Sequence, residues 1–185
     1  YAGGYDTANT GEAYTYDGST WTGIPALTTA RRSLDNMGAG TTTAGLVAGG
    51  YVEPPTIGDS EEWNGTSWTE GSNLNTVRSS GTAGGTQTAA FMAGGHGPPE
   101  SNATENYNGT SWTSSGNLNV ARRLAGGGGS QTDGILFGGY APPGNQNVVE
   151  NYDGSTWTAN PATLATARHA GAGTNQPAVA TAAFY

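Results

Sequence analysis

The chain has 185 residues, of which 34% are hydrophobic and 32 are Gly, and its formal net charge is -8. This composition argues against helices and for many short strands joined by turns, so we expect an all-β fold. Fourteen carboxylates face six positive charges, all Arg, so no basic patch is available to bind phosphates, and nucleic acid and anionic membranes are not expected as partners. The absence of Cys excludes disulfides, thiolate metal sites and cysteine nucleophiles, and no apolar run is long enough to span a bilayer.

Landmarks recur about every 45 residues along the chain, beginning with the Gly-Gly of the opening "YAGGY". Each Gly-Gly precedes a hairpin-like segment that ends in Trp, and then a segment such as "LTTAR" that closes in Arg. The markers are Gly3-Gly4, Gly49-Gly50, Gly94-Gly95 and Gly138-Gly139, then Trp21, Trp68, Trp112 and Trp157, and then Arg31, Arg78, Arg122 and Arg168. Because three independent markers share one period, we divide the chain into repeats of roughly 2–47, 48–92, 93–137 and 138–185.

Each period predicts four short strands, which the third-to-fourth copy shows clearly. "RLAGGGGS" (123–130) is a strand of small residues, "GILFGGY" (134–140) is apolar, and "VVENY" (148–152) and "STWTAN" (155–160) follow. The Gly-rich strand fits an innermost position where strands crowd around an axis. The apolar strand would form the layer between neighbouring units, and the Trp would cap that layer from outside. One such unit cannot bury its own faces, so we expect the units to pack radially as the blades of a β-propeller.

The last two strands of each unit are joined by Asn-Gly or Asp-Gly, a strong signal for a type I′ hairpin turn. The turn is similar to the Asp-box of sialidases, but it is one residue shorter, and Asn64 and Asn108 stand where Asp17 and Asp153 stand in the other copies. We therefore interpret these positions as turn chemistry and not as catalytic acids. Asn64, Asn102 and Asn108 also match the N-glycosylation sequon, whose use depends on the host.

The order of these motifs resembles the kelch repeat. Gly-Gly ends the second strand, an aromatic follows about a dozen residues later, and Trp comes about five residues after that; the aromatics are Tyr16, Trp63, Tyr107 and Tyr152. The resemblance covers the whole chain and implies kelch-type propeller blades of four antiparallel strands. The phrases "NGTSWT", "LNTVR" and "GTQTAA" are further similar to kelch-like repeat proteins of marine phages and bacteria.

The two ends of the sequence both read as the second strand of a unit, "YAGGY" at the start and "TAAFY" at the end. Four blades would be few for the kelch family. We therefore expect residues 1–185 to be a single propeller or a propeller fragment, and we favour a piece of a longer array. The rival is a four-bladed ring that is closed by pairing the N-terminal strand into the last unit.

No Ser-His-Asp set, phosphate loop or metal-ligand cluster stands out, so we predict no catalytic residues, cofactor or metal within this stretch. The copper chemistry of galactose oxidase, a kelch-like propeller enzyme, needs Tyr and His ligands and a Tyr crosslinked to Cys, whereas this chain has no Cys and only two His. His96 takes the slot of Tyr5, Tyr51 and Tyr140 and is expected to replace an aromatic packing residue. His169 lies at a varied position and is expected to face solvent or a channel.

Acidic residues recur before the aromatic of the third strand, where we place Glu12, Glu61, Glu105 and Glu150. A residue that is repeated in every unit usually serves the unit. These glutamates are therefore expected to pair with the recurrent Arg or with backbone donors.

The loops between the second and third strands vary while their surroundings repeat, as in "VEPPTIGDS", "GPPESNA" and "APPGNQN". Variable loops on a rigid scaffold are where binding specificity is normally placed, although tolerant surface turns stiffened by Pro-Pro would look the same. In propellers such loops share one face with the connections that carry the recurrent Arg. The candidate ligand-binding residues are Arg31, Arg78, Arg122, Arg168, Glu53, Pro54, Pro55, Pro98, Pro99 and Asn145.

These features favour a non-enzymatic structural or recognition propeller of a virion or extracellular surface, such as a phage tail, fibre or capsid appendage. Its expected partners are other virion or surface proteins and a host glycan or receptor, and a homo-oligomer stays open. One alternative is the propeller portion of a carbohydrate-active or oxidative enzyme whose catalytic residues lie outside this stretch. The other is an intracellular kelch adaptor.

Overall fold

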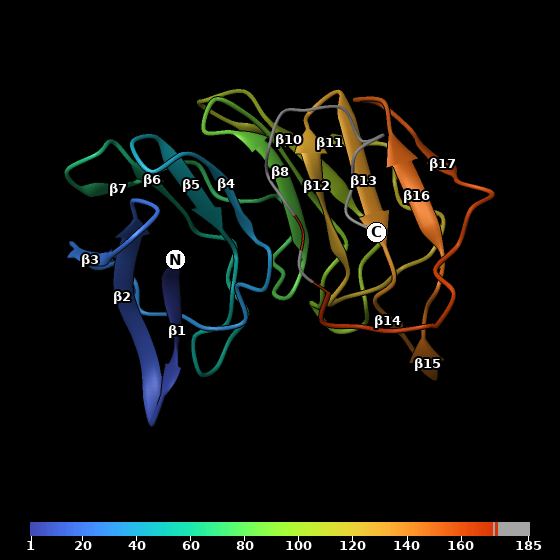
Figure 1. Ribbon diagram of the computed structural model, residues 1–185, viewed down its shortest axis with the longest axis horizontal. Helices are drawn as coiled ribbons and strands as arrows, with labels where there is room; N and C mark the ends of the chain where they lie inside the picture. The colour runs from blue at the N-terminus through green and yellow to red at the C-terminus, as the bar shows by residue number, and fades with distance from the viewer. Residues whose placement is uncertain (172, 174–185) are drawn as a thin grey trace.

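The computed structural model describes residues 1–171 and 173, which form a series of antiparallel sheets and contain no helix (Figure 1). Four sheets follow one another in chain order. The first is β1 (Ala2–Asp6), β2 (Ala8–Tyr16) and β3 (Trp21–Ile24); the second is β4 (Gly38–Gly40), β5 (Gly45–Ala48), β6 (Ser60–Trp63) and β7 (Trp68–Glu70). The third is β8 (Thr82–Thr86), β9 (Ala89–Ala93), β10 (Thr104–Tyr107) and β11 (Trp112–Ser115); the fourth is β12 (Gly126–Ser130), β13 (Asp133–Phe137), β16 (Val149–Tyr152) and β17 (Trp157–Ala159).

The predicted all-β class and four-stranded units are confirmed. Three sheets have four consecutive antiparallel strands, and the small hairpin of β14 (Tyr140–Ala141) and β15 (Gly144–Asn145) sits in the variable loop of the fourth. Each complete sheet takes its first two strands from one sequence repeat and its last two from the next, because a period fixes the length of a unit but not its starting point. The first sheet has three strands, and β1 pairs only with β2 among the described residues.

The Gly-rich strands lie innermost, as predicted. β8 contacts both β4 and β12, so the first strands of three successive sheets lie side by side. Gly84 on β8 shows why small residues are needed there: a Cβ at this position would come within 2.9 Å of the carbonyl oxygen of Gly129 on the neighbouring sheet. Any side chain would push the inner strands apart.

A series of single backbone hydrogen bonds links the sheets along this inner edge. The amide of Ser80 donates to the carbonyl of Ser33, that of Leu124 to Ser80, and that of Ala170 to Leu124, at 2.8–2.9 Å. All four residues have positive φ, between 52° and 57°, and each follows a recurrent Arg by two positions. Within residues 1–171 and 173, no hydrogen bond returns from Ala170 to Ser33, so closure of a ring is not observed.

Apolar layers fill the spaces between the second, third and fourth sheets, and the predicted Trp residues, Trp112 and Trp157, close them. Trp112, which is 6% exposed, packs in a cluster with Met37 and Leu46 of the second sheet and Met92 of its own. Trp157 contacts the Phe91 ring of the third sheet edge-on and donates from Nε1 to the Thr104 hydroxyl at 2.8 Å. The Trp of one sheet therefore caps the layer that it shares with the preceding sheet.

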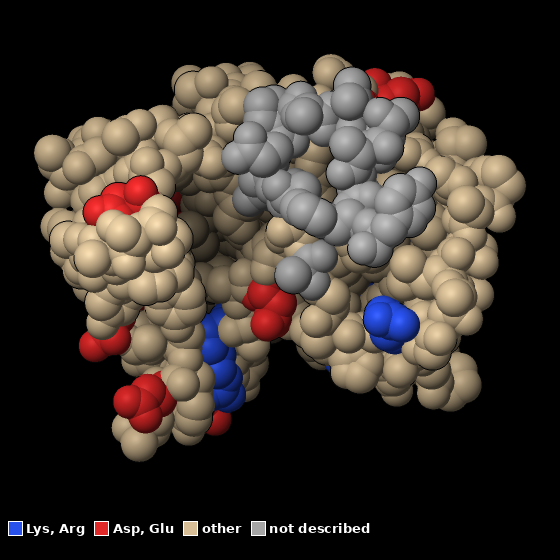
Figure 2. Space-filling view, in the orientation of Figure 1, with Lys and Arg blue, Asp and Glu red and all other residues tan. Residues whose placement is uncertain are grey.

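The first sheet presents the same aromatic pair to solvent. The Tyr16 and Trp21 rings contact each other at a tilt, with centroids 5.0 Å apart, yet they are 46% and 62% exposed, because no described sheet precedes theirs. A hollow of about 1090 Å³ separates this sheet from the second; its lining includes Tyr1, Tyr14, Leu34 and Met37 (Figure 2). Among the described residues, no helix is long and apolar enough to cross a membrane.

Candidate functional site

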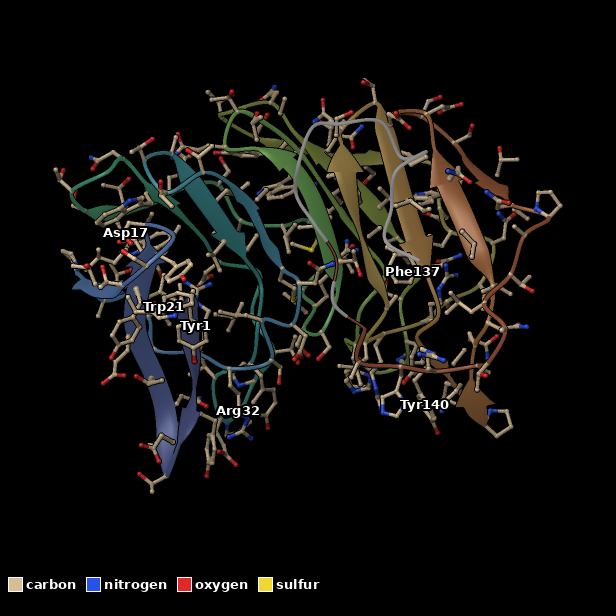
Figure 3. The ribbon with its side chains drawn as sticks, in the orientation of Figure 1. Tyr1, Asp17, Trp21, Arg32, Phe137 and Tyr140 are labelled. Atoms are coloured by element: carbon tan, nitrogen blue, oxygen red, sulfur yellow. The ribbon has the colours of Figure 1, made fainter. Side chains whose placement is uncertain are left out.

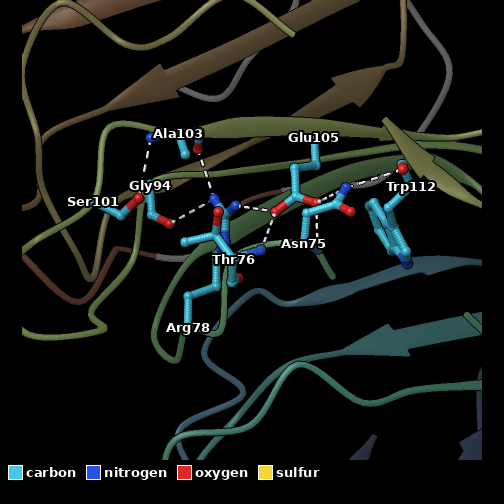
Figure 4. A network of polar contacts seen from close by, with 8 residues as sticks. All are labelled: Asn75, Thr76, Arg78, Gly94, Ser101, Ala103, Glu105 and Trp112. Atoms are coloured by element: carbon cyan, nitrogen blue, oxygen red, sulfur yellow. Dashed lines mark hydrogen bonds and ion pairs between the residues drawn. The ribbon is translucent and has the colours of Figure 1, made fainter. Parts of the chain in front are cut away.

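The recurrent Arg residues join each sheet to the next through buried ion pairs. Arg78 lies in the connection between β7 and β8. Its guanidinium bonds the Glu105 carboxylate of the third sheet, and both side chains are almost fully buried (Figure 4). Arg78 also donates to the carbonyls of Gly94 and Ala103, at 3.2 and 2.6 Å. Arg31–Glu61 and Arg122–Glu150 form the same pair at the two neighbouring junctions.

Backbone amides complete each of these carboxylate sites. Glu105 accepts from the amides of Asn75 and Thr76, at 2.7 and 3.1 Å, and from the Asn75 side chain. Glu61 likewise accepts from the amides of Thr28 and Thr29. The predicted pairing of the recurrent Glu with the recurrent Arg and with backbone donors is therefore confirmed at Glu61, Glu105 and Glu150.

Burial and pairing act in opposite directions on the pKa values of these groups. Burial lowers the pKa of Arg78 and of Arg122, and the facing carboxylates oppose that shift. For Glu150, burial acts to raise the pKa, but hydrogen bonds from Arg122 and Asn119 outweigh it and hold the pKa below its ordinary value. The Arg and Glu side chains of these pairs are therefore buried ion pairs that join neighbouring sheets.

The placement of Glu12 in this series is wrong. The aromatic of the third strand pairs with the Trp of the fourth in every sheet, and the paired Glu lies two residues before that aromatic. In the first sheet, the residue two positions before the aromatic Tyr16 is Tyr14. Glu12 stands two positions before Tyr14, and its side chain is exposed. Glu12 is the nearest carboxylate before Tyr16, but it stands four residues before that aromatic and not two.

The recurrent Arg residues are predicted to contact a ligand, and their burial decides whether a ligand can reach them. Arg31, Arg78 and Arg122 are 0% exposed, so their guanidinium groups are not accessible to a ligand. Arg168 differs: it is exposed, and its described side-chain hydrogen bond runs from Nε to the carbonyl of Thr166 at 3.3 Å.

The variable loops and the residues after the recurrent Arg lie together on one face, which we call the loop face. Isolated antiparallel bridges join Arg32 to Tyr51, Ser79 to His96, and Arg123 to Tyr140. Each bridge links the connection that leaves one sheet to the loop of the next. Arg32 and Tyr140 lie in the lower part of the view, and Asp17 of a hairpin lies above them, at the left (Figure 3).

One cluster on the loop face is centred on Arg32. Its guanidinium carbon lies 4.7 Å from the Tyr5 ring centroid and 4.8 Å from that of Tyr51, so the cation lies between aromatic rings of two successive sheets. The same group bonds the Glu53 carboxylate at 3.1 Å. Tyr5 is 58% exposed, so one side of the cluster is open to solvent.

A second cluster repeats this arrangement around Arg123. Its guanidinium lies 5.1 Å from the Tyr140 ring centroid and bonds the Glu100 carboxylate at 2.8 Å. His96 takes the place of the first tyrosine, with its Nδ1 3.2 Å from Arg123 Nη1 and 3.5 Å from the Glu100 carboxylate. His96 thus takes the slot of the tyrosines, and the contacts described for its ring are the polar ones to Arg123 and Glu100.

Next to the Arg123 cluster on the loop face lies His169, whose exposed ring contacts the Tyr140 ring edge-on. His169 Nδ1 lies 2.8 Å from the side-chain oxygen of Asn145. The expectation that His169 faces solvent is confirmed, and Asn145, a predicted ligand contact, is exposed beside it.

The predicted loop residues lie beside these clusters. Glu53, Pro54, Pro55, Pro98 and Pro99 are exposed, and the bonds Pro54-Pro55, Pro98-Pro99 and Pro142-Pro143 are cis. The loops end alike, because Ile57, Ser101 and Gln146 each donate a backbone bond to the second Gly of the preceding Gly-Gly. Sequence reasoning missed Arg32, Arg123 and Glu100 as surface groups; the recurrence of Arg directly after two of the recurrent Arg was the available signal.

The hairpin carboxylates serve the turns, as predicted. Asp153 accepts from the amides and hydroxyls of Ser155 and Thr156, which holds its pKa well below the ordinary value. Asn108 accepts from Thr110 and Ser111 in the same geometry. Within the described part of the chain, no group of three or more His, Cys, Asp or Glu side chains is placed to hold a metal ion.

Comparison with known proteins finds relatives among solved structures. No family model and no curated protein sequence matches the chain. A solved structure described as "Structure of YjhT" is similar with a TM-score of 0.70 and 14% sequence identity. The match covers 91% of this chain but 66% of that structure, so the chain spans less than two thirds of its relative. At this identity the likeness shows the fold alone: the chain is an all-β protein of repeated blade-like sheets in a propeller-like arrangement.

Proposed function

We propose that this protein is a non-enzymatic recognition array of an extracellular or virion surface, and that its loop face binds a host glycan. The observation that carries this proposal is the pair of Arg-centred clusters, Tyr5–Arg32–Tyr51 and His96–Arg123–Tyr140. Each cluster spans two sheets and remains partly open to solvent. The buried pairs beneath them, such as Arg78–Glu105, make the supporting scaffold rigid.

The chemistry of the loop face favours a sugar. Tyrosine offers a flat apolar face with a polar tip, and Arg, Asn and carboxylate groups supply the donors and acceptors that hydroxyl-rich ligands need. Glu53 and Glu100 hold Arg32 and Arg123 in place, so little side-chain order has to be acquired on binding. A rigid aromatic beside an oriented polar group is a common composition for recognition surfaces.

An immobilised array of neutral and acidic glycans, probed with the fluorescently labelled protein at physiological salt, tests the proposal. The wild type should bind a subset of glycans, and Tyr140→Ala and Arg123→Ala should each reduce that binding at least about tenfold. Tyr16→Ala is the matched control, because it removes an exposed tyrosine from the first sheet, away from the loop face. Absence of binding to every glycan, or equal loss in the control, would contradict the proposal.

A further inference from the structure

The segment 164–168 at the end of the fourth sheet repeats the local structure of the three buried ion-pair sites. The amide of Leu164 bonds the carbonyl of Asn147 at 2.8 Å, as the amide of Leu27 bonds that of Gly11. Arg168 Nε donates to the carbonyl of Thr166 at 3.3 Å, as Arg31 Nε does to that of Thr29 at 3.2 Å. We call this segment the open socket.

Among the described residues, the open socket has none of the carboxylate acceptors that fill the other sites. At the first junction, the amides of Thr28 and Thr29 and the Arg31 guanidinium all bond the Glu61 carboxylate. The equivalent donors are the amides of Ala165 and Thr166 and the guanidinium of Arg168. Neither of these amides has a hydrogen bond within the part of the chain that the structure describes, and Arg168 is exposed there.

Two of the three filled sites, those of Arg31 and Arg78, show which backbone carbonyls accompany the carboxylate. Arg31 Nη1 donates to the carbonyls of Gly49 and Asp59, and Arg78 Nη1 to those of Gly94 and Ala103. In each case the first carbonyl belongs to the first Gly of a Gly-Gly, and the second lies two residues before the glutamate. An occupant therefore needs a Gly-Gly strand end and a third strand with Glu two residues after a free carbonyl.

The first sheet of this chain does not meet that requirement. It has the Gly3-Gly4 strand end, but Tyr14 occupies the glutamate position. A second copy of the chain offers the same sheet, and its glutamates at the other junctions are already buried in their own pairs. Closure of one chain into a ring would therefore bring no Glu of the first sheet to the open socket. Head-to-tail pairing of two copies would bring none either.

We propose that the open socket receives the glutamate of a further sheet of this repeat type, which continues the array beyond the fourth sheet. The carboxylate would bond the amides of Ala165 and Thr166 and the guanidinium of Arg168, as Glu61 bonds its own partners. The loop face would gain one more interface between sheets, next to Tyr140 and His169.

Amide hydrogen exchange in the 185-residue protein gives the first test. The amides of Ala165 and Thr166 should exchange at least about 100-fold faster than those of Thr28 and Thr29, because only the latter donate to a buried carboxylate. In addition, Arg168→Gln should leave the denaturation midpoint unchanged, whereas Arg31→Gln should lower it. Equal protection at the two sites, or equal loss in the two variants, would mean that the socket is filled within the chain and would overturn the proposal.

An extended chain gives the second test. Residues 138–168 are appended as a copy after Tyr185, so that the copy of Glu150 can reach the open socket. Protection of the Ala165 and Thr166 amides should then rise about 100-fold, and Glu150→Gln in the appended copy should abolish most of that rise. Unchanged protection in an extension whose own strands are protected would contradict the proposal.

Discussion

Arg78 of the second sheet and Glu105 of the third bond each other with almost no exposed surface on either side chain. Removing one partner of such a pair leaves an uncompensated buried charge, which is more costly than the net stabilisation of the pair itself. Arg78→Met should therefore lower the free energy of unfolding by about 3–5 kcal/mol, measured by urea denaturation.

Arg168→Met is the matched control for this variant. Arg168 belongs to the same sequence motif, but it is exposed and has no ion pair among the described residues. Its replacement should change the free energy of unfolding by less than about 0.5 kcal/mol. Similar losses in the two variants would show that the environments of the two Arg do not differ as described.

Trp112 and Trp21 occupy equivalent positions in different surroundings. Trp112 is 6% exposed within the layer between the second and third sheets, whereas Trp21 is 62% exposed. Trp112→Ala should lower the free energy of unfolding by about 3–5 kcal/mol, because it opens a cavity in that layer. Trp21→Ala should cost much less than Trp112→Ala in the same urea titration. A near-zero loss at Trp112 would refute the assignment of this Trp to the inter-sheet layer.

Gly109 of the third hairpin has a φ of 91°, which a β-branched residue adopts only with strain. A Cβ there would also lie 3.3 Å from the Thr88 side chain. Gly109→Val should lower the melting temperature and cost about 1–3 kcal/mol. Gly144→Val is the control, since a Cβ at Gly144 meets no atom within 4 Å and its φ is not positive. Equal melting temperatures for the two variants would contradict this account of the turn.

The Asp153 carboxylate should remain ionised at pH 3, because hydrogen bonds from Thr156 and Ser155 lower its pKa from the ordinary 3.8. Since the pKa is lower in the folded state than in the unfolded state, the carboxylate stabilises the hairpin fully above pH 3.8. That contribution is lost as the pH falls through the lowered folded value. Carboxyl ¹³C shifts in an NMR titration should show no transition at Asp153 above pH 3. A midpoint at or above 3.8 would be inconsistent with the turn geometry.

Much of the fold could be predicted because the physical constraints repeat. Gly-rich strands such as β8 must be innermost where backbones approach closely, and Trp112 must find a buried layer. Asn-Gly and Asp-Gly fix the hairpins through their tolerance of positive φ. These are local rules, and four copies of the same motif make them readable from one sequence.

The site was harder to predict, because repetition does not distinguish a buried residue from an exposed one. Arg78 and Arg168 end the same motif, yet one is buried by the following sheet and the other is not. Glu12 was misplaced because it is the nearest carboxylate before Tyr16 but stands four residues before it, whereas the paired glutamates stand two residues before their aromatic. The Arg32 and Arg123 clusters arise between sheets, so their contacts depend on tertiary packing.

We propose that the loop face of the sheet array binds a glycan. The most direct measurement is an amide NMR titration of the wild-type protein with the strongest ligand from the glycan array. The account predicts saturable shifts of residues around Tyr51, His96, Arg123 and Tyr140, with few changes in the hairpins near Asp17 and Asp153. Shifts confined to the hollow between the first and second sheets, or to the hairpins, would contradict it.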